Sequence, residues 1–335
     1  MISEHMKENA LKATPTRTLF DCLDLSNSFG IYEGEPQELC RTIKKNFAKA
    51  IELYNEKQFG FIREVIPLMA DKNGIIEELP DYFYTFYINK FVYLFYWEDK
   101  FYIVMPDELI AIYQEKINEK GFMEINSHNQ EMAIYARALL NLHGIYEIEQ
   151  FVWVWNQHHK NKINYAEAER FLSDLSEFHS DYYIDENWVI HECIFSDDDF
   201  DELFETVKDS HYFMPPKSVI TVYGADDFEY DEIPEVRKIC DFLVAYISDE
   251  RNLDDLQLEI SLSFYRYESP SQIRKYLNDR GFPLNDVEAV AKFEKLYQVA
   301  RENVHVWEFH GRMPRQYELT TGKTLKRFEL PKNKK

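Results

Sequence analysis

The sequence predicts an α+β protein that is mostly helical. Between residues 136 and 217, apolar residues recur at helical spacing in successive segments and then alternate as in a strand. From Pro234 onward the apolar spacing is helical throughout. Glycine is scarce, at 10 of 335 residues beside 25 Phe and 23 Tyr, which argues against glycine-rich phosphate-binding loops.

Residues 1–36 combine turn-forming residues with weak periodicity. They are predicted to be an arm with at most one short helix, near Arg17–Leu25. Apolar residues then follow helical spacing in two segments, Glu38–Glu56 and Phe59–Ala70. Lys72-Asn73-Gly74 is a typical helix stop, so two consecutive helices are expected here.

A β-region and a further helix are predicted next. Three runs rich in aromatic and branched residues are expected to be strands: Tyr82–Tyr87, Phe91–Trp97 and Phe101–Met105. Glu98-Asp99-Lys100 would form the hairpin turn between the last two. Asp107 is expected to cap a helix that runs to about Glu119. Residues 37–122 therefore form a first predicted domain of helices and a hairpin.

A second domain is predicted over residues 129–217. Its expected elements, in order, are three helices and a strand–turn–strand unit: Glu131–Leu142, Ile148–His158, Tyr165–Leu175 and Tyr182–Ile194. Gly144 suits a left-handed helix end, and Asn164 with Glu167 matches a capping box. This order is that of a winged helix, which the first domain fits more loosely. The sequence thus predicts two winged-helix-like modules with short β-hairpins.

The remainder of the chain is predicted to be helical. Ser196 is expected to cap an acidic helix at about Asp198–Lys208. Further helices are expected at 235–248, 253–265, 270–280 and 285–302. They define a helical C-terminal domain over residues 218–320, followed by a basic tail over residues 321–335.

The charge of the chain is strongly negative and uneven. The net charge is −22, and the 55 residues from Asp181 to Glu235 hold 17 acidic residues against Lys208 and Lys217. The tail reverses the sign, with six basic residues against Glu329. A large negative field repels nucleic acid unless a local basic face escapes it. An acidic face of this kind suits solvation, or a partner with a basic surface.

Cysteine usage and hydropathy indicate a reduced, cytoplasmic protein. The four cysteines lack C-x-x-C spacing, and the first residues lack the apolar core of a signal peptide. The most apolar stretch, Phe83 to Trp97, is too short and too interrupted for a membrane span. No P-loop, G-x-S-x-G or H-E-x-x-H motif occurs. The sequence therefore predicts neither an enzyme nor a cofactor.

Several motifs resemble those of a group of uncharacterised bacterial proteins. They are A-x-x-L-L-N-L-H-G-I-Y-E-I-E-Q-F from Ala136, Y-Y-I-D-E-N-W-V-I-H-E from Tyr182, Y-F-M-P-P-K from Tyr212 and W-E-F-H-G-R-M-P-R-Q-Y from Trp307. The resemblance covers about residues 130–317 and implies a winged-helix-like module. Many of those relatives carry a C-terminal SEC-C zinc motif, like that of the SecA tail. This sequence has no cysteine beyond Cys240, so that zinc site is not expected here.

The helix in the DNA-reading position of the second module has the wrong chemistry for that task. Its exposed face offers one arginine, Arg170, among the carboxylates of Glu167, Glu169 and Asp174, whereas base edges are read by Arg, Lys, Asn and Gln. A metal site at His191, Glu192 and the following aspartates is not expected either. Strand alternation sends neighbouring side chains to opposite faces, and three aspartates in a row are typical of a helix start.

A set of side chains is predicted to contact a partner: Trp153, Asp197, Asp198, Asp199, Asp201, Glu202, Arg312 and Arg315. Trp153 points away from the apolar stripe of its helix that holds Trp155, and the acidic residues crowd one short helix. The function expected from this pattern is a non-enzymatic regulatory or scaffolding role through protein–protein contacts. Two alternatives stay open. One is a nucleic-acid-associated regulator that uses the basic C-terminal end, and the other an acidic nucleic-acid mimic that inhibits a basic DNA-processing enzyme.

Overall fold

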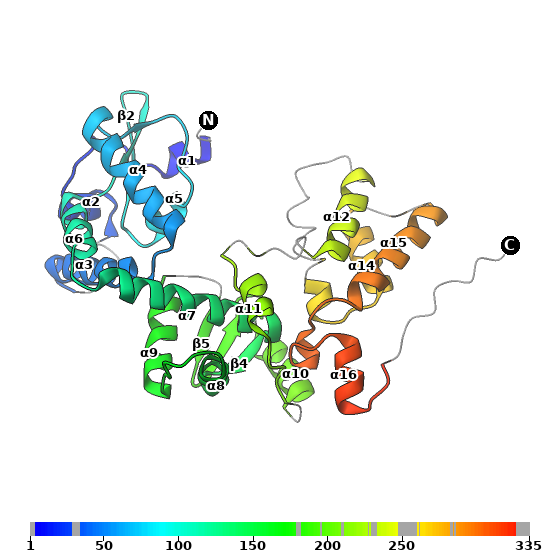
Figure 1. Ribbon diagram of the computed structural model, residues 1–335. Coiled ribbons are helices and arrows are strands. Elements are labelled where there is room, and N and C mark those ends of the chain that lie inside the picture. Colours follow the sequence, from blue (N-terminus) through cyan, green and yellow to red (C-terminus); the bar gives the residue numbers. More distant parts are fainter. Residues whose placement is uncertain are drawn as a thin grey trace. The chain divides into compact units, whose positions relative to one another are not determined.

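The computed structural model describes residues 4–28, 34–178, 182–194, 196–208, 211–226, 228, 233–246, 260, 262–281, 284 and 286–325. These residues are mostly helical and include two small antiparallel sheets of three strands each (Figure 1). The contacts divide the chain into two compact units. Unit 1 comprises Met1–Ala133 and Arg170–Ser180, and unit 2 comprises Ile134–Glu169 and Asp181–Lys335.

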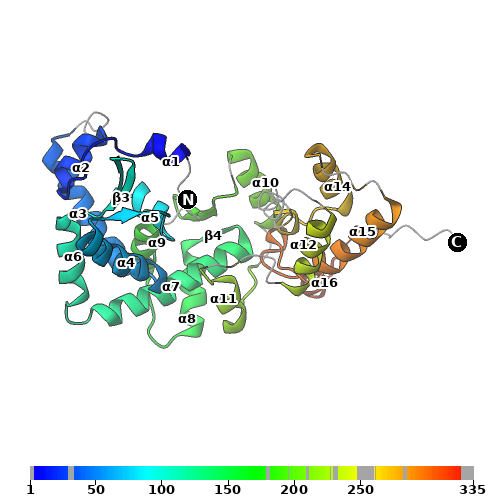
Figure 2. The same cartoon turned by 90° about the horizontal axis from the view of Figure 1, so that it is seen from above.

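Unit 1 packs helices around an aromatic core and one sheet. Its elements are α1 (Glu4–Asn9), α2 (Leu19–Leu25), α3 (Pro36–Leu53), α4 (Glu56–Lys72), β1 (Ile75–Ile76), α5 (Phe83–Ile88), β2 (Tyr93–Trp97), β3 (Lys100–Val104) and α6 (Asp107–Ile117). Helices α3 and α6 contact each other and lie side by side in Figures 1 and 2. Phe47, Phe86 and Phe91 are fully or almost fully buried, and Phe91 packs edge-on against both other rings.

The predicted hairpin is present as β2 and β3, in a sheet of order β1-β3-β2. Glu98 and Asp99 form its turn with positive φ angles of 49° and 56°, which matches the right-handed twist of the paired strands. The outer edge of β2 is also covered. The Leu11 N–H donates to the Leu94 carbonyl at 2.8 Å, and the Tyr96 N–H donates to the Leu11 carbonyl at 2.9 Å. The N-terminal arm thereby protects a strand edge that would otherwise offer unpaired groups.

Three predictions in unit 1 are wrong. The arm contains two helices, α1 and α2, rather than one. Tyr82–Tyr87, predicted as a strand, is largely the helix α5, because Phe83 and Phe86 share a buried face while Tyr84 is 54% exposed. Aromatic residues suit both structures, so composition alone did not separate them. Asp107 does not cap α6: it is the first helical residue and forms an ion pair with Arg17 at 2.8 Å.

Helix α7 (Phe122–His143) carries the chain from unit 1 into unit 2, and it begins earlier than the predicted Glu131–Leu142. Unit 2 continues with β4 (Ile145–Glu147), α8 (Ile148–His158), α9 (Tyr165–Ser176), β5 (Tyr182–Asp185) and β6 (Trp188–His191). From Arg170 onward α9 belongs to unit 1. The second sheet has the order β4-β6-β5. The predicted helices, the hairpin and the Asn164–Glu167 capping box are confirmed, with reciprocal bonds of 2.9 and 3.0 Å.

The C-terminal part of unit 2 is helical, as predicted. Its elements are α10 (Asp197–Val207), α11 (Lys217–Tyr223), α12 (Pro234–Tyr246), α14 (Pro270–Asp279), α15 (Val287–Arg301), the 3₁₀ helix η4 (Trp307–Phe309) and α16 (Pro314–Thr321). Helix α15 contacts both α12 and α14, and these three helices form a group in Figure 2. Most of the predicted helix at 253–265 lies outside the described residues. Within the part of the chain that is described, no helix is long and apolar enough to cross a membrane.

Candidate partner-binding site

Helix α10 presents the acidic residues that the sequence singles out. The Ser196 hydroxyl accepts from the Asp199 N–H at 3.2 Å and donates to the Asp199 carboxylate at 2.8 Å, so it caps the helix as predicted. Asp198, Asp201 and Glu202 are exposed, and Asp199 is half-buried. The Asp197 side chain lies outside the described part. Carboxylates in a first helical turn are stabilised by the positive end of the helix dipole.

A cavity of about 290 Å³ opens beside α10 in unit 2. Helix α10 contacts η4, and the cavity is bounded by these two elements, the segment 265–268 and the first turn of α14. The lining residues are Ile194, Asp199, Glu202, Leu203, Thr206, Tyr265, Arg266, Glu268, Gln272, Trp307 and Glu308. Buried apolar side chains therefore meet several carboxylates in one hollow.

The charge of the cavity is negative. Asp199, Glu202, Glu268 and Glu308 face one guanidinium, that of Arg266. Burial raises the pKa of Glu308 from 4.5 to about 7, and the negative charges of Glu202 and Glu268 act in the same direction while Arg301 opposes them. The site thus holds one carboxyl that ionises more readily when a cation approaches.

Replacing this carboxyl is expected to stabilise the protein above neutral pH. The folded Glu308 keeps its proton to higher pH than the unfolded one, so its ionisation costs stability as the pH rises from about 4.5 to 7. We expect Glu308→Gln to raise the free energy of unfolding by about 1–2 kcal/mol at pH 8, after allowance for partial exposure. Urea denaturation at pH 8 and pH 4.5 checks this, since the gain must vanish at the lower pH.

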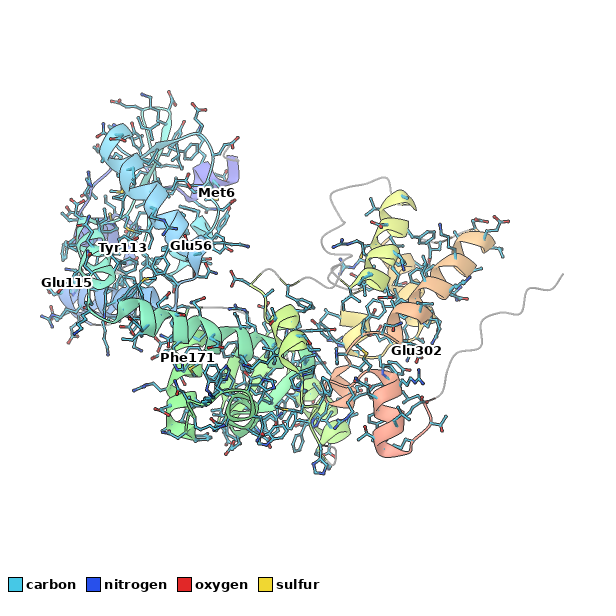
Figure 3. All side chains as sticks on the ribbon, viewed as in Figure 1. Met6, Glu56, Tyr113, Glu115, Phe171 and Glu302 are labelled. Carbon is cyan, nitrogen blue, oxygen red and sulfur yellow. The ribbon has the colours of Figure 1, made fainter. Side chains whose placement is uncertain are left out.

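Residues 304–314, the closing loop, contribute Trp307 and Glu308 to the lining of the cavity. The loop follows Glu302 at the end of α15, which is labelled in Figure 3. Its Trp307 is 2% exposed, stacks on Tyr265 with ring centroids 4.2 Å apart, and donates through Nε1 to the Asn141 carbonyl at 3.1 Å. A Cβ on Gly144 would come within 2.5 Å of the Trp307 ring. The loop is therefore seated directly on the end of α7.

Four segments that are far apart in the sequence meet where the closing loop contacts the end of α7. The His191 N–H donates to the Gly144 carbonyl at 2.9 Å, and the His191 ring lies 5.0 Å from that of Trp307. The Phe213 N–H donates to the His310 carbonyl, also at 2.9 Å. Segments far apart in the sequence thus form one packed cluster.

Arg312 is not available to a phosphate or a carboxylate, and its assignment to a binding surface is wrong. The residue is 8% exposed, and its guanidinium donates to the carbonyls of His211, Tyr212 and Phe309. Its bonds to His211 and Tyr212 link the closing loop to the segment before α11. Arg315, three residues on, is exposed. Of the predicted basic tail, residues 326–335 lie outside the described residues.

Trp153 is 44% exposed, whereas Trp155 on the same helix is 1% exposed, as the helical spacing predicts. Trp153 does not line the cavity. Glu268 and Glu308 do, and sequence reasoning missed them because each is a single acidic residue without a local pattern. Among the described residues, no group of three His, Cys, Asp or Glu side chains is arranged to hold a metal ion.

Helix α9 forms an ion pair within unit 1 through Asp174. Lys49 on α3 lies 2.6 Å from the Asp174 carboxylate and 3.5 Å from that of Glu177. Phe178, just beyond the helix, contacts the Phe91 ring. Because Asp174 is negatively charged and paired with α3, the C-terminal half of α9 is poorly suited to enter a DNA groove.

The comparisons with known proteins identify no relative: no family model, no curated protein and no solved structure matches the chain. The assignment of function therefore depends on the geometry of the chain itself.

Proposed function

We propose that this chain is a non-enzymatic binding protein that captures a basic segment of a protein partner in the cavity beside α10. The observation that carries the proposal is that Asp199 and Glu202 from α10 line the same cavity as Glu268 and Glu308, together with the apolar side chains of Leu203 and Trp307. A lysine or arginine side chain has the matching chemistry. Its methylene stem packs on apolar surface while its charged end pairs with carboxylates.

We further propose that the two sheets belong to winged-helix-like modules used for protein contact. Both have three strands in the same order, with the first strand pairing with the last: β1-β3-β2 and β4-β6-β5. In unit 2 the order helix, strand, helix, helix, hairpin adds support, and unit 1 has one helix instead of two between its first strand and its hairpin. The Asp174 carboxylate of α9 is already paired with Lys49 within unit 1, which argues against DNA reading by this helix.

The test is binding of a hexa-arginine peptide by isothermal titration calorimetry. We expect the double variant Glu202→Gln and Glu308→Gln to bind at least about tenfold more weakly, since two charge-assisted contacts are lost. The matched control is Asp198→Asn with Asp201→Asn, which removes two exposed charges from α10 outside the cavity lining. Equal weakening in both variants would mean that only the general negative field attracts the peptide, and the cavity proposal would fail.

Two separate measurements test the two nucleic-acid alternatives. A regulator that uses the basic end predicts salt-sensitive DNA or RNA binding at about 50 mM salt, lost on deletion of residues 321–335. Burial of Arg312 removes one of the two arginines on which that reading depended. An acidic mimic predicts that the protein competes with DNA for a basic DNA-processing enzyme. Neither result is expected if the cavity accounts for binding.

A further inference from the structure

Three buried histidines meet where the closing loop contacts the end of α7. His143 at the end of α7 is fully buried, and His305 and His310 of the loop are 2% and 3% exposed. The His310 ring stacks on Tyr212 with centroids 4.1 Å apart, and the His143 ring lies 5.1 Å from Tyr212 and 6.3 Å from His310. The loop is closed on itself by the Gly311 N–H, which donates to the Val306 carbonyl at 3.0 Å, and by a bond between His305 Nδ1 and the Gly311 carbonyl.

The charged groups around this cluster favour neutral histidines. The loop contributes the guanidinium of Arg312, which is held by backbone carbonyls. The segment before α11 contributes Tyr212 and the exposed His211, and β6 contributes His191. Strand β4 contributes the carboxylate of Glu147, which already accepts a hydrogen bond from the Tyr212 hydroxyl at 2.9 Å. Among these described neighbours no carboxylate is placed against the His143 ring.

The closing loop packs closely against the buried His143 ring. A Cβ on Gly311 would lie 2.7 Å from two atoms of the His143 ring. Burial lowers the pKa of His143 well below its usual range, and His310, His305 and Arg312 act in the same direction. Burial likewise lowers the pKa of His305 to about 4, although its bond to the Gly311 carbonyl opposes this. A proton on either ring is thus far more stable after the loop has left its seat.

We infer that the closing loop is a proton-operated latch: it is seated when His143 and His305 are neutral, and their protonation in acid releases it from α7. Release withdraws Trp307 and Glu308, so the cavity beside α10 exists at neutral pH and is lost in acid. This inference goes beyond the proposed function and holds whatever the cavity binds.

The size of the effect follows from the difference between the seated and released histidines. A released histidine takes up a proton near pH 6.5, and the seated His305 near pH 4, so seating weakens as the pH falls below about 6.5. From pH 7 to pH 5 this difference shifts the equilibrium toward release by about 20-fold for each such histidine. Glu308, on the same loop, acts in the opposite direction, because its carboxyl takes up a proton near pH 7 in the seated loop and near pH 4.5 after release, and this favours seating by about 40-fold. Two histidines therefore leave a net shift toward release of about tenfold.

Hydrogen exchange followed by mass spectrometry on the full chain tests the latch. After correction for intrinsic exchange rates, we expect the protection of residues 304–314 to fall about tenfold from pH 7 to pH 5. Helix α8, in the same unit, is the internal reference and is expected to keep its protection. Simultaneous loss in the loop and in α8 would indicate general acid unfolding and overturn the inference, as would a loop whose protection ignores pH.

Two variants test whether the buried histidine rings cause the loss of loop protection in acid. We expect His143→Gln to reduce the loss of loop protection between pH 7 and pH 5 by about tenfold or more, since one titrating group is gone. His128→Gln, at an exposed histidine of α7, is the matched control and should leave the loss unchanged. A loss that is the same in both variants contradicts the assignment. If His143→Gln does not fold, the wild-type comparison of loop and α8 still decides the question.

Discussion

Replacing Trp307 by Ala is expected to lower the free energy of unfolding by about 3–5 kcal/mol. The ring is 2% exposed and stacks on Tyr265, and the glycine at position 144 leaves the space that the ring fills. Its removal leaves a cavity and deprives the Asn141 carbonyl of its donor, and each of these losses is destabilising. The closing loop would also lose the contacts of this ring with Asn141 and Gly144 at the end of α7.

The matched control for this variant is Trp153→Ala, which removes the same side chain from a site that is 44% exposed. We expect it to cost less than about 1 kcal/mol, because little buried area is lost. Urea denaturation of both variants, followed by far-ultraviolet circular dichroism, measures the difference. Similar losses would show that Trp307 is not the anchor of the loop.

The regular elements were predictable because apolar spacing reports helices directly. Helix α8 begins and ends where the pattern Ile148, Phe151, Val152 and Trp155 predicts, and the Asn164 capping box fixes the start of α9. The pattern was ambiguous at α5, where six consecutive residues include four aromatic ones. Periodicity over so short a run does not separate a helix from a strand.

Only half of the candidate site was predictable from the sequence. Asp199 and Glu202 stand in a dense acidic run, which draws attention to them, and the structure places both at the cavity. Glu268 and Glu308 reach the same cavity from segments more than 60 and 100 residues further along the chain. Glu308 reaches the cavity through the docking of the closing loop, and Glu268 through the packing of the segment before α14, and neither tertiary contact has a local signature in the sequence. The prediction for Arg312 was wrong for a different reason. A basic residue in an acidic chain suggests a surface role, whereas the Arg312 guanidinium donates to backbone carbonyls.

Replacing Gly311 by Ala is expected to lower the free energy of unfolding by about 2–4 kcal/mol. Two costs add. The residue has a φ of +75°, which an L side chain rarely adopts, and the new Cβ would lie 2.7 Å from the His143 ring. That ring is fully buried, so we expect the clash to displace the loop.

Gly281→Ala separates the two costs. Gly281 has a φ of +86°, and nothing lies within 4 Å of the Cβ that alanine would add there. This variant therefore carries the backbone strain alone and is expected to cost about 1 kcal/mol. The excess loss in Gly311→Ala, measured in the same urea titration, is the contribution of close packing between the loop and His143. Equal losses in the two variants would mean that the loop does not need contact with His143, and the latch would then have no mechanical basis.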